Sequence, residues 1–183
     1  QLNKSSLKNL DILDLGCGGG LVSESLARLK GNVTGVDFVK NNIDVARFHS
    51  MQSKLKINYI HADIENLKVD KKFDLIILFE ILEHLEDWTK FLNYISKNLK
   101  KNGLIIISTI NRNFISNLTA IFIAENLLGW VPKGTHSYEK FIKPEEIERV
   151  MMNTNNYELK DLKGLIFNPI NFSWILQKNT SIN

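Results

Sequence analysis

A cluster of glycines near the start of the sequence carries its clearest chemical signal. Residues 11–21 read Asp-Ile-Leu-Asp-Leu-Gly-Cys-Gly-Gly-Gly-Leu, an apolar run that ends in four glycines around Cys17, before a helical pattern begins at Leu21. Glycine permits positive φ and has no Cβ, so a ligand can lie against the backbone, and the unpaired N–H groups at a helix start favour a negative group. The segment therefore predicts a strand, a tight turn and a helix that hold the anionic end of a ligand.

The spacing of these glycines narrows the choice of ligand. The dinucleotide fingerprint G-x-G-x-x-G would need a third glycine at position 21, where this chain has Leu21. The glycines instead fall at Gly16, Gly18 and Gly20 and follow Asp14. This pattern disfavours a nicotinamide or flavin site. A glycine turn that serves only close helix–strand packing is the structural alternative, and the entropic cost of so many glycines argues against it.

An aspartate follows the next predicted strand, which spans residues 33–37. Asp37 lies about twenty residues beyond the glycines, where α/β folds place an acid that accepts hydrogen bonds from the ribose hydroxyls of a nucleoside. The alternative is that Asp37 caps the following helix. We therefore take Asp37 as a candidate ribose ligand.

A second cluster of candidate residues follows the almost continuous apolar run 73–79. Glu80, Glu83 and His84 come directly after this run, which predicts a central strand buried on both faces. Parallel α/β sheets bind ligands at the carboxyl edge of their strands. The two glutamates and the histidine should therefore lie at the same edge as the glycine turn.

The elements that must position these residues alternate between strands and helices. This alternation, with a ligand loop after the first strand, predicts an α/β fold with a doubly wound parallel sheet. The further predicted strands are 58–61, 104–109 and 157–162, and the predicted helices are 21–29, 41–55, 88–99 and 144–153. Apolar residues at helical spacing support the second helix, through Ile43, Ala46, Phe48 and Met51.

The length and composition of the chain limit its number of domains, its partners and its compartment. A chain of 183 residues that is 44% hydrophobic can bury one core, so we expect a single domain over residues 1–183. A net charge of +3, scattered along the chain and without an aromatic-rich basic stripe, gives no reason to expect a nucleic-acid partner. The single cysteine, Cys17, excludes internal disulfides and fits a reducing, cytoplasmic compartment. The first residue, Gln1, and the last, Asn183, suggest truncation at both ends.

An apolar segment at 114–130 is interrupted by Asn117, Glu125 and Asn126, so we do not expect it to span a membrane. It lies in an expected substrate or lid insertion at about residues 111–143. Two interpretations remain open, a core or lid helix over the substrate and an amphipathic helix on a bilayer.

Six motifs together cover almost the whole chain. They are 14–20, Glu80-x-x-Glu83-His84, Ser108-Thr109-x-Asn111-Arg112-Asn113, 131–136 (Val-Pro-Lys-Gly-Thr-His), 141–144 (Phe-Ile-Lys-Pro) and Gly164-x-x-x-Asn168-Pro169. This combination resembles the ubiquinone-biosynthesis O-methyltransferase family of class I S-adenosylmethionine-dependent methyltransferases, whose members methylate catechol hydroxyls on polyprenylated rings at two steps of the pathway. The resemblance implies a Rossmann-like, mostly parallel sheet that lacks the last strand and the N-terminal helices.

The resemblance also implies roles for individual residues. Cofactor contacts are expected at Gly16, Gly18, Asp37 and Phe79, with Phe79 beside the adenine. Asp63, just past the strand 58–61, is either an adenine contact or a turn residue. The family's N-terminal segment, with a cofactor-binding arginine, has no counterpart in this sequence.

Catalysis is expected at Glu80, Glu83 and His84, which the resemblance makes ligands of a magnesium ion. The metal would stabilise a phenolate as a Lewis acid. Two other interpretations stay open: His84 acts directly as a general base, or Glu83 and Glu86 only favour the start of the next helix and His84 is a partly exposed turn residue. Four aromatic residues could wall an apolar site, namely Phe79, Phe114, Trp130 and Phe167.

The expected partners follow from the same resemblance. They are a polyprenylated catechol or quinol substrate, the inner face of the membrane through about residues 114–136, and a ubiquinone-biosynthesis complex. The alternatives are a methyltransferase for another small metabolite, a cofactor-binding module without catalysis, and, more distantly, a dinucleotide reductase.

Overall fold

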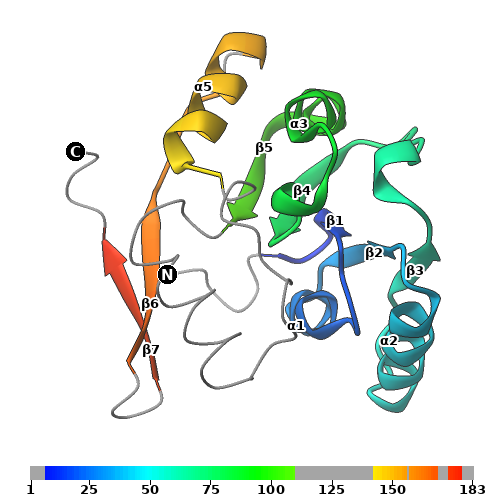
Figure 1. The fold of residues 1–183 in the computed structure, drawn as a ribbon. Coiled ribbons are helices and arrows are strands. Elements are labelled where there is room, and N and C mark those ends of the chain that lie inside the picture. The colour runs from blue at the N-terminus through cyan, green and yellow to red at the C-terminus, as the bar shows by residue number, and fades with distance from the viewer. Residues whose placement is uncertain (1–6, 110–141, 156, 169–172, 179–183) are drawn as a thin grey trace.

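A parallel sheet with helices on both faces forms the centre of the molecule (Figure 1). The computed structural model describes residues 7–109, 142–155, 157–168 and 173–178. Its main sheet has five strands in the order β3-β2-β1-β4-β5, and all their pairings are parallel. The predicted doubly wound fold is confirmed. The strands are β1 (Asp11–Leu15), β2 (Asn32–Asp37), β3 (Asn58–His61), β4 (Phe73–Phe79) and β5 (Leu99–Ser108).

Four α-helices are described around the sheet, and two short 3-10 helices follow strands β3 and β4. The helices α1 and α2 pack on one face of the sheet, and α3 and α5 pack on the other. Their bounds are α1 (Leu21–Arg28), α2 (Lys40–Gln52), α3 (Trp88–Ser96), α5 (Pro144–Asn155), η1 (Ile64–Asn66) and η2 (Leu82–His84).

The buried strands contribute alternate side chains to the hydrophobic cores on the two faces of the sheet. In β1, Ile12 points to the α1 face, whereas Leu13 and Leu15 point to the α3 face. Successive side chains of a strand point to opposite faces, so a central strand with helices on both sides must be apolar almost throughout. This requirement is met by β1 and β4, and it explains why the apolar run 73–79 is a strand as predicted.

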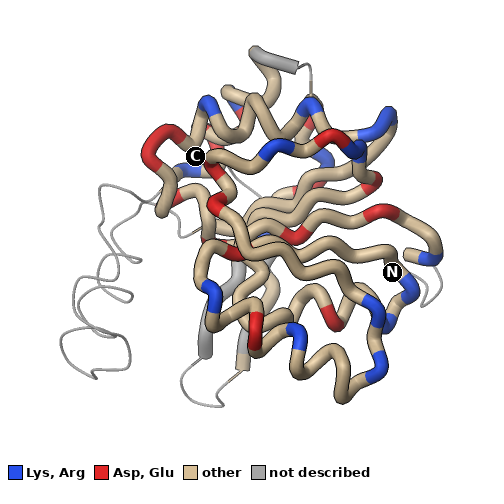
Figure 2. The backbone as a smooth tube through the Cα atoms, turned by 90° about the vertical axis from the view of Figure 1, so that its right-hand side faces the viewer, with Lys and Arg blue, Asp and Glu red and all other residues tan. Residues whose placement is uncertain are grey.

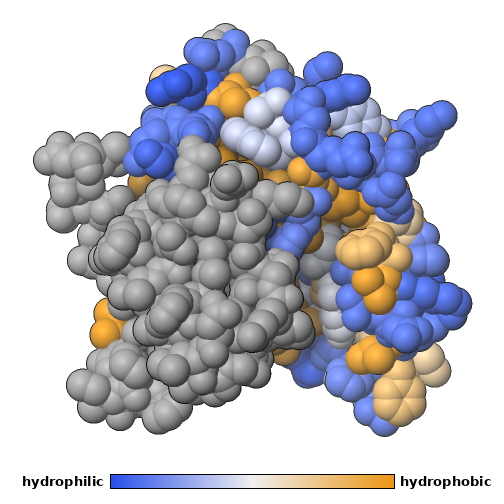
Figure 3. Space-filling model, viewed as in Figure 1, coloured by the Kyte–Doolittle hydropathy of each residue, from blue (hydrophilic) through white to orange (hydrophobic). Residues whose placement is uncertain are grey.

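Helix α2 shows a different buried face from the one its sequence suggests. Ile43, Ala46 and Ser50 are buried, whereas Phe48 and Met51 are exposed. The buried residues follow the i, i+3, i+7 spacing of one helix face, and the larger apolar residues lie off it. Figure 3 shows hydrophobic surface along the side of the molecule that α2 covers.

Strand β5 begins earlier than predicted. It pairs with β4 through Leu99 and Phe73, and again from Leu104 and Leu75 onward, with a register shift between them. Asn102 there has a φ of 64°. The strand predicted at 104–109 is therefore the second part of a longer strand, with an irregularity before residue 104.

The predicted strand 157–162 is wrong. The strand lies further along, as β6 (Lys163–Asn168), and it pairs antiparallel with β7 (Ser173–Lys178) in a separate two-stranded sheet. Tyr157 packs against the core on the α3 face, and its hydroxyl donates to the Ser96 carbonyl at 2.8 Å. This contact holds the start of the segment against α3. The last five residues, 179–183, lie outside the described part.

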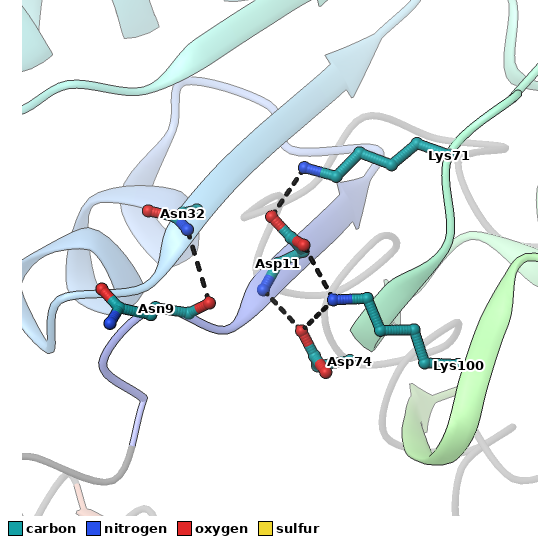
Figure 4. A network of polar contacts seen from close by, with 6 residues as sticks. All are labelled: Asn9, Asp11, Asn32, Lys71, Asp74 and Lys100. Atoms are coloured by element: carbon teal, nitrogen blue, oxygen red, sulfur yellow. Dashed lines mark hydrogen bonds and ion pairs between the residues drawn. The ribbon is translucent and has the colours of Figure 1, made fainter.

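Charged residues of both signs are interspersed over the helices and loops around the sheet (Figure 2). One network of them joins three strands at the amino edge of the sheet (Figure 4). The Asp11 carboxylate contacts Lys71 Nζ at 2.6 Å and Lys100 Nζ at 2.8 Å. Asp74 Oδ2 accepts from Lys100 Nζ and from the Asp11 backbone N–H, each at 2.8 Å. The network therefore ties together β1, β4 and β5.

These contacts change the pKa values of the two aspartates. The hydrogen bond from Lys100 lowers the pKa of Asp74, assisted by the Asp11 backbone N–H. The hydrogen bonds from Lys100 and Lys71 lower the pKa of Asp11. Carboxyls whose pKa is lower in the folded state stabilise it above their unfolded pKa, and the contribution is lost as the pH falls through the folded pKa.

We predict that Asp74→Asn lowers the Tm at pH 7 by a few degrees and that this difference shrinks as the pH falls below about 4, because the wild-type carboxylate is then protonated as well. The measurement is a series of thermal melts between pH 3 and pH 7. Asp70→Asn, which removes the same charge from an exposed position just before β4, is the control. A Tm difference that stays constant with pH would contradict the ionic role.

Candidate functional site

The glycine turn lies at the carboxyl end of β1 and is held to β2 by backbone hydrogen bonds. The N–H groups of Gly16 and Cys17 both donate to the Val36 carbonyl, at 2.8 and 3.0 Å. Gly20 donates to the Cys17 carbonyl at 2.9 Å and, with a φ of 87°, is the N-cap residue of α1. The turn is therefore a fixed loop that delivers the chain from the strand into the helix.

Two of the three motif glycines are required by close packing. A Cβ on Gly16 would lie 1.9 Å from Ile81 Cδ1, and one on Gly20 would lie 2.3 Å from the Tyr59 hydroxyl. A Cβ on Gly18 would meet open space, although the φ of Gly18 is 51°. Gly18 thus faces outward, where a ligand could lie against its backbone.

Asp37 joins the end of β2 to this turn. Its Oδ2 accepts from the Gly18 N–H at 2.9 Å, and its Oδ1 accepts from the Val39 N–H at 2.8 Å and from Asn42 Nδ2 at 3.3 Å. The N-cap residue of α2 is Val39, two positions after Asp37, so Asp37 bonds the backbone at the start of this helix without being its N-cap residue. Because Oδ2 accepts a hydrogen bond from the Gly18 N–H and a carboxylate oxygen can accept two, this side chain has capacity for a ribose hydroxyl.

Asp14 lies behind the turn and is 2% exposed. The Ser23 hydroxyl donates to its Oδ2 at 2.6 Å. Burial raises the pKa of Asp14 to about 6, and the hydrogen bonds from Ser23 act in the opposite direction. Asp14 therefore changes charge close to neutral pH.

Cys17 is buried beside Asp14 in the same turn. Burial raises the pKa of its thiol to about 12, with smaller effects from Asp14 and Asp37. A thiol with this pKa stays protonated at neutral pH and is a poor nucleophile. Cys17 is therefore a packing residue, as its position suggests.

Phe38 was not identified from the sequence, yet it is 70% exposed directly after Asp37. Its backbone carbonyl is bonded to His61 Nε2 at 2.9 Å, which fixes the end of β2 against the end of β3. An exposed aromatic face at this edge can stack on a planar ring. The signal that could have found it is an aromatic residue immediately after the acid at the strand end.

Two other predicted contacts lie at the same edge. Phe79 ends β4 and is partly exposed. Asp63 is the N-cap of η1 and accepts from the Glu65 N–H at 3.0 Å, so the turn role is the one that the structure shows.

Glu80 follows Phe79 in an unusual backbone conformation, with a φ of 52°. This left-handed region costs a residue with a side chain about 1–2 kcal/mol. The Glu80 N–H donates to the Ser108 carbonyl at 3.1 Å, and the Ser108 hydroxyl donates to Glu80 Oε1 at 2.6 Å. Hydrogen bonds from the end of β5 therefore hold the exposed Glu80 side chain in place.

Glu83 and His84 lie in η2, where their side chains have different surroundings. Glu83 is 5% exposed, whereas His84 is exposed. Across the part of the chain that the structure describes, no three His, Cys, Asp or Glu side chains are grouped closely enough to hold a metal ion. Glu80, Glu83 and His84 thus do not fit a magnesium site in this conformation, and the metal role stays a prediction.

Several predicted features lie outside the described residues. They include the resemblance motifs between 111 and 136, most of the expected insertion at 111–143, and the aromatic residues Phe114 and Trp130. The Phe167 side chain is also not described, although its backbone lies in β6.

Comparisons with known proteins agree with this geometry. A family model for a methyltransferase domain matches residues 6–166. An S-adenosylmethionine-dependent methyltransferase from Clostridium acetobutylicum is 28% identical, with a TM-score of 0.56 over 64% of this chain and 49% of its own. The magnesium protoporphyrin IX methyltransferase of Synechocystis, solved with bound SAH, shares the fold at 17% identity, with a TM-score of 0.67 over 92% of this chain and 71% of its own. The fold and the family model define this protein as a Rossmann-like class I methyltransferase.

Relatives with higher sequence identity show which methyltransferase family the chain belongs to. The ubiquinone biosynthesis O-methyltransferase of Rickettsia typhi is 44% identical over 183 residues, which are 100% of this chain and 74% of the relative. The protein of the same name from Pelagibacter ubique is 48% identical over 177 residues, 97% of this chain and 73% of the relative. The chain belongs to the ubiquinone biosynthesis O-methyltransferase family, which confirms the resemblance inferred from the motifs.

The raised pKa of Asp14 predicts how stability depends on pH. Because Asp14 titrates near 6 when folded and at 3.8 as a free side chain, the folded state holds this proton more tightly, and stability is lost as the pH rises between these values. We predict that Asp14→Asn, which cannot ionise, removes this loss and raises the free energy of unfolding by about 2–3 kcal/mol at pH 7.

Chemical denaturation at pH 4, 5, 6 and 7 measures the effect. Asp44→Asn removes the same charge from the exposed face of α2 and should show no such gain, since Lys40 lowers the pKa of Asp44. A gain in Asp14→Asn that is equally large at pH 4 would contradict the assignment.

Proposed function

We propose that this chain transfers a methyl group from S-adenosylmethionine to a catechol hydroxyl on a polyprenylated ring intermediate of ubiquinone biosynthesis, at two steps of the pathway. The observation that carries the proposal is the contact between the glycine turn and Asp37, with Gly18 N–H bonded to Asp37 Oδ2 at 2.9 Å. The names of the relatives support the choice of pathway and of O-methylation.

The residues at the carboxyl edge fit the chemical groups of this cofactor. Asp37 has acceptor capacity for ribose hydroxyls, and the backbone at Gly18 is open to an amino-acid group. Phe38 and Phe79 offer aromatic surface for an adenine. When bound, S-adenosylmethionine supplies a methyl group on a sulfonium, which a nucleophile attacks in line with the departing sulfur.

The protein must also make a phenol nucleophilic. A phenol with a pKa near about 10 is mostly protonated at neutral pH. His84 is exposed at the edge where Glu80 lies, and a neutral imidazole there can take the phenolic proton as the O–C bond forms and the S–C bond breaks. Glu80 can accept a hydrogen bond from a catechol hydroxyl and so orient the ring. We propose His84 as the general base and Glu80 as the orienting carboxylate.

Binding of magnesium by Glu80, Glu83 and His84 is the alternative route to a phenolate. It would require these side chains to reorganise, because the structure does not group them. Glu83 is buried and would have to move outward.

The polyprenyl chain of the substrate supports a proposed contact with the inner face of the membrane through about residues 114–136, which lie outside the described part. None of the helices within residues 7–109, 142–155, 157–168 and 173–178 combines the length and the hydropathy that a bilayer crossing needs. Membership of a ubiquinone-biosynthesis complex and a cytoplasmic location belong to the same proposal. Methylation of another small metabolite and cofactor binding without catalysis are the competing functions.

We predict that Asp37→Asn weakens binding of S-adenosylhomocysteine at least tenfold, because an amide nitrogen cannot accept hydrogen bonds where a carboxylate oxygen did. Calorimetric titration of the purified chain measures the Kd, and thermal melts check that the variant is folded. The exposed substitution Asp44→Asn should leave the Kd unchanged. Unaltered binding in a folded Asp37→Asn variant would refute the ribose assignment.

We predict that His84→Ala lowers the turnover of a catechol substrate about a hundredfold or more, whereas EDTA leaves wild-type turnover unchanged, because the proton passes to the imidazole and not to a metal-bound group. Methyl transfer to a short-chain prenylated catechol measures both effects. Loss of activity in EDTA that added magnesium restores would support the metal route. A folded wild-type chain that binds S-adenosylhomocysteine but methylates no catechol would contradict the proposed function.

A further inference from the structure

Ser108 is the residue through which β5 holds Glu80. The two residues share two hydrogen bonds, one through the backbone and one through the side chains. The backbone bond, Glu80 N–H to the Ser108 carbonyl at 3.1 Å, continues the β4–β5 ladder one residue past the last pair, Phe79 with Ser108. The side-chain bond, from Ser108 Oγ to Glu80 Oε1, is 2.6 Å long. Hydroxyl donors bond a carboxylate at such short distances when the acceptor is charged.

The strained backbone conformation of Glu80 indicates that its side chain is held at this position for a function. Among the described residues other than glycine, positive φ also occurs at Asn9, Lys30, Lys54 and Asn102. Lys30 and Lys54 follow the ends of α1 and α2, where such conformations are common. Glu80 instead stands at the carboxyl edge of a central strand. Backbone strain that is retained at a ligand-binding edge points to a function for the side chain that it presents.

Glu80 also follows the strand that pairs with the one leading into the glycine turn. Leu15 pairs with Leu78 in the β1–β4 register, so Gly16 and Glu80 leave neighbouring strand ends. The side chain of the next residue, Ile81, fills the space in front of Gly16. A substrate ring held in front of the turn would therefore meet the Glu80 carboxylate.

We propose that Ser108 is a positioning residue for methyl transfer, which fixes the Glu80 carboxylate toward the hydroxyl of the substrate. The inference rests on the proposed function. The Ser108 hydroxyl engages Oε1 and directs Oε2 to the substrate side, where it accepts a hydrogen bond from a catechol hydroxyl. Without that hydroxyl, the exposed glutamate side chain regains its free rotamers while the backbone bond stays in place. Misplacement of an orienting group by about an ångström is enough to lower a rate strongly.

The test compares Ser108→Ala, Ser108→Thr, Glu80→Gln and the double variant Ser108→Ala/Glu80→Gln. We expect Ser108→Ala to lower kcat about tenfold, with the KM for S-adenosylmethionine and the Kd for S-adenosylhomocysteine unchanged. Ser108→Thr keeps a hydroxyl and should restore most of kcat. Because Ser108 acts through Glu80, removing the hydroxyl should cost nothing further in the Glu80→Gln background.

Ser53→Ala is a matched control. The Ser53 hydroxyl also lies within hydrogen-bond distance of a glutamate, Glu24 Oε2 at 3.4 Å, but at the end of α2 and away from the sheet edge. It should leave kcat unchanged.

Two results would overturn the inference in an active enzyme: the same fall in kcat from Ser108→Ala in both backgrounds, or full activity in Glu80→Gln. A wild-type chain that methylates no catechol would remove the proposed function itself, and the positioning role with it.

Discussion

The site depends on one hydrogen bond, from the Gly18 N–H to the Asp37 carboxylate, which joins the ends of β1 and β2. It can form only because the two strands are parallel and in register, with Leu15 opposite Val36. The Val36 carbonyl then receives both N–H groups that open the turn. A carboxylate that is buried and bonded to backbone donors is held in one orientation. The proposed cofactor contacts thus follow from the register of two central strands.

Some of this arrangement follows directly from the sequence. The almost continuous apolar run 73–79 is bounded by Lys72 and Glu80, so its strand was predicted with the observed bounds, and the strand 58–61 was predicted with the observed bounds as well. The strand predicted at 157–162 lies instead at 163–168, and Tyr157 bonds Ser96, a partner 61 positions away that local pattern cannot show. The helix predicted at 41–55 is present as α2 (Lys40–Gln52); of its apolar residues Ile43 and Ala46 are buried, whereas Phe48 and Met51 are exposed.

The part of the site formed by Glu80, Glu83 and His84 shows more clearly what the sequence alone cannot predict. Sequence placed Glu80, Glu83 and His84 at the carboxyl edge, which only requires knowing where β4 ends. Their directions depend on φ at Glu80 and on a 3-10 turn, in which consecutive residues point about 120° apart. Glu83 is therefore buried where His84 is exposed. Spacing that suggests a three-ligand metal site cannot show whether the three side chains converge.

The same three strands carry an ion network at one edge of the sheet and the candidate functional site at the other. At the amino edge, Asp11 of β1, Asp74 of β4 and Lys100 of β5 form the ion network. At the carboxyl edge, these three strands end at the glycine turn, at strained Glu80 and at Ser108. A strained backbone conformation persists only where contacts with the surrounding structure hold it. The unfavourable backbone conformation of Glu80 is therefore retained where two hydrogen bonds with Ser108 hold this residue.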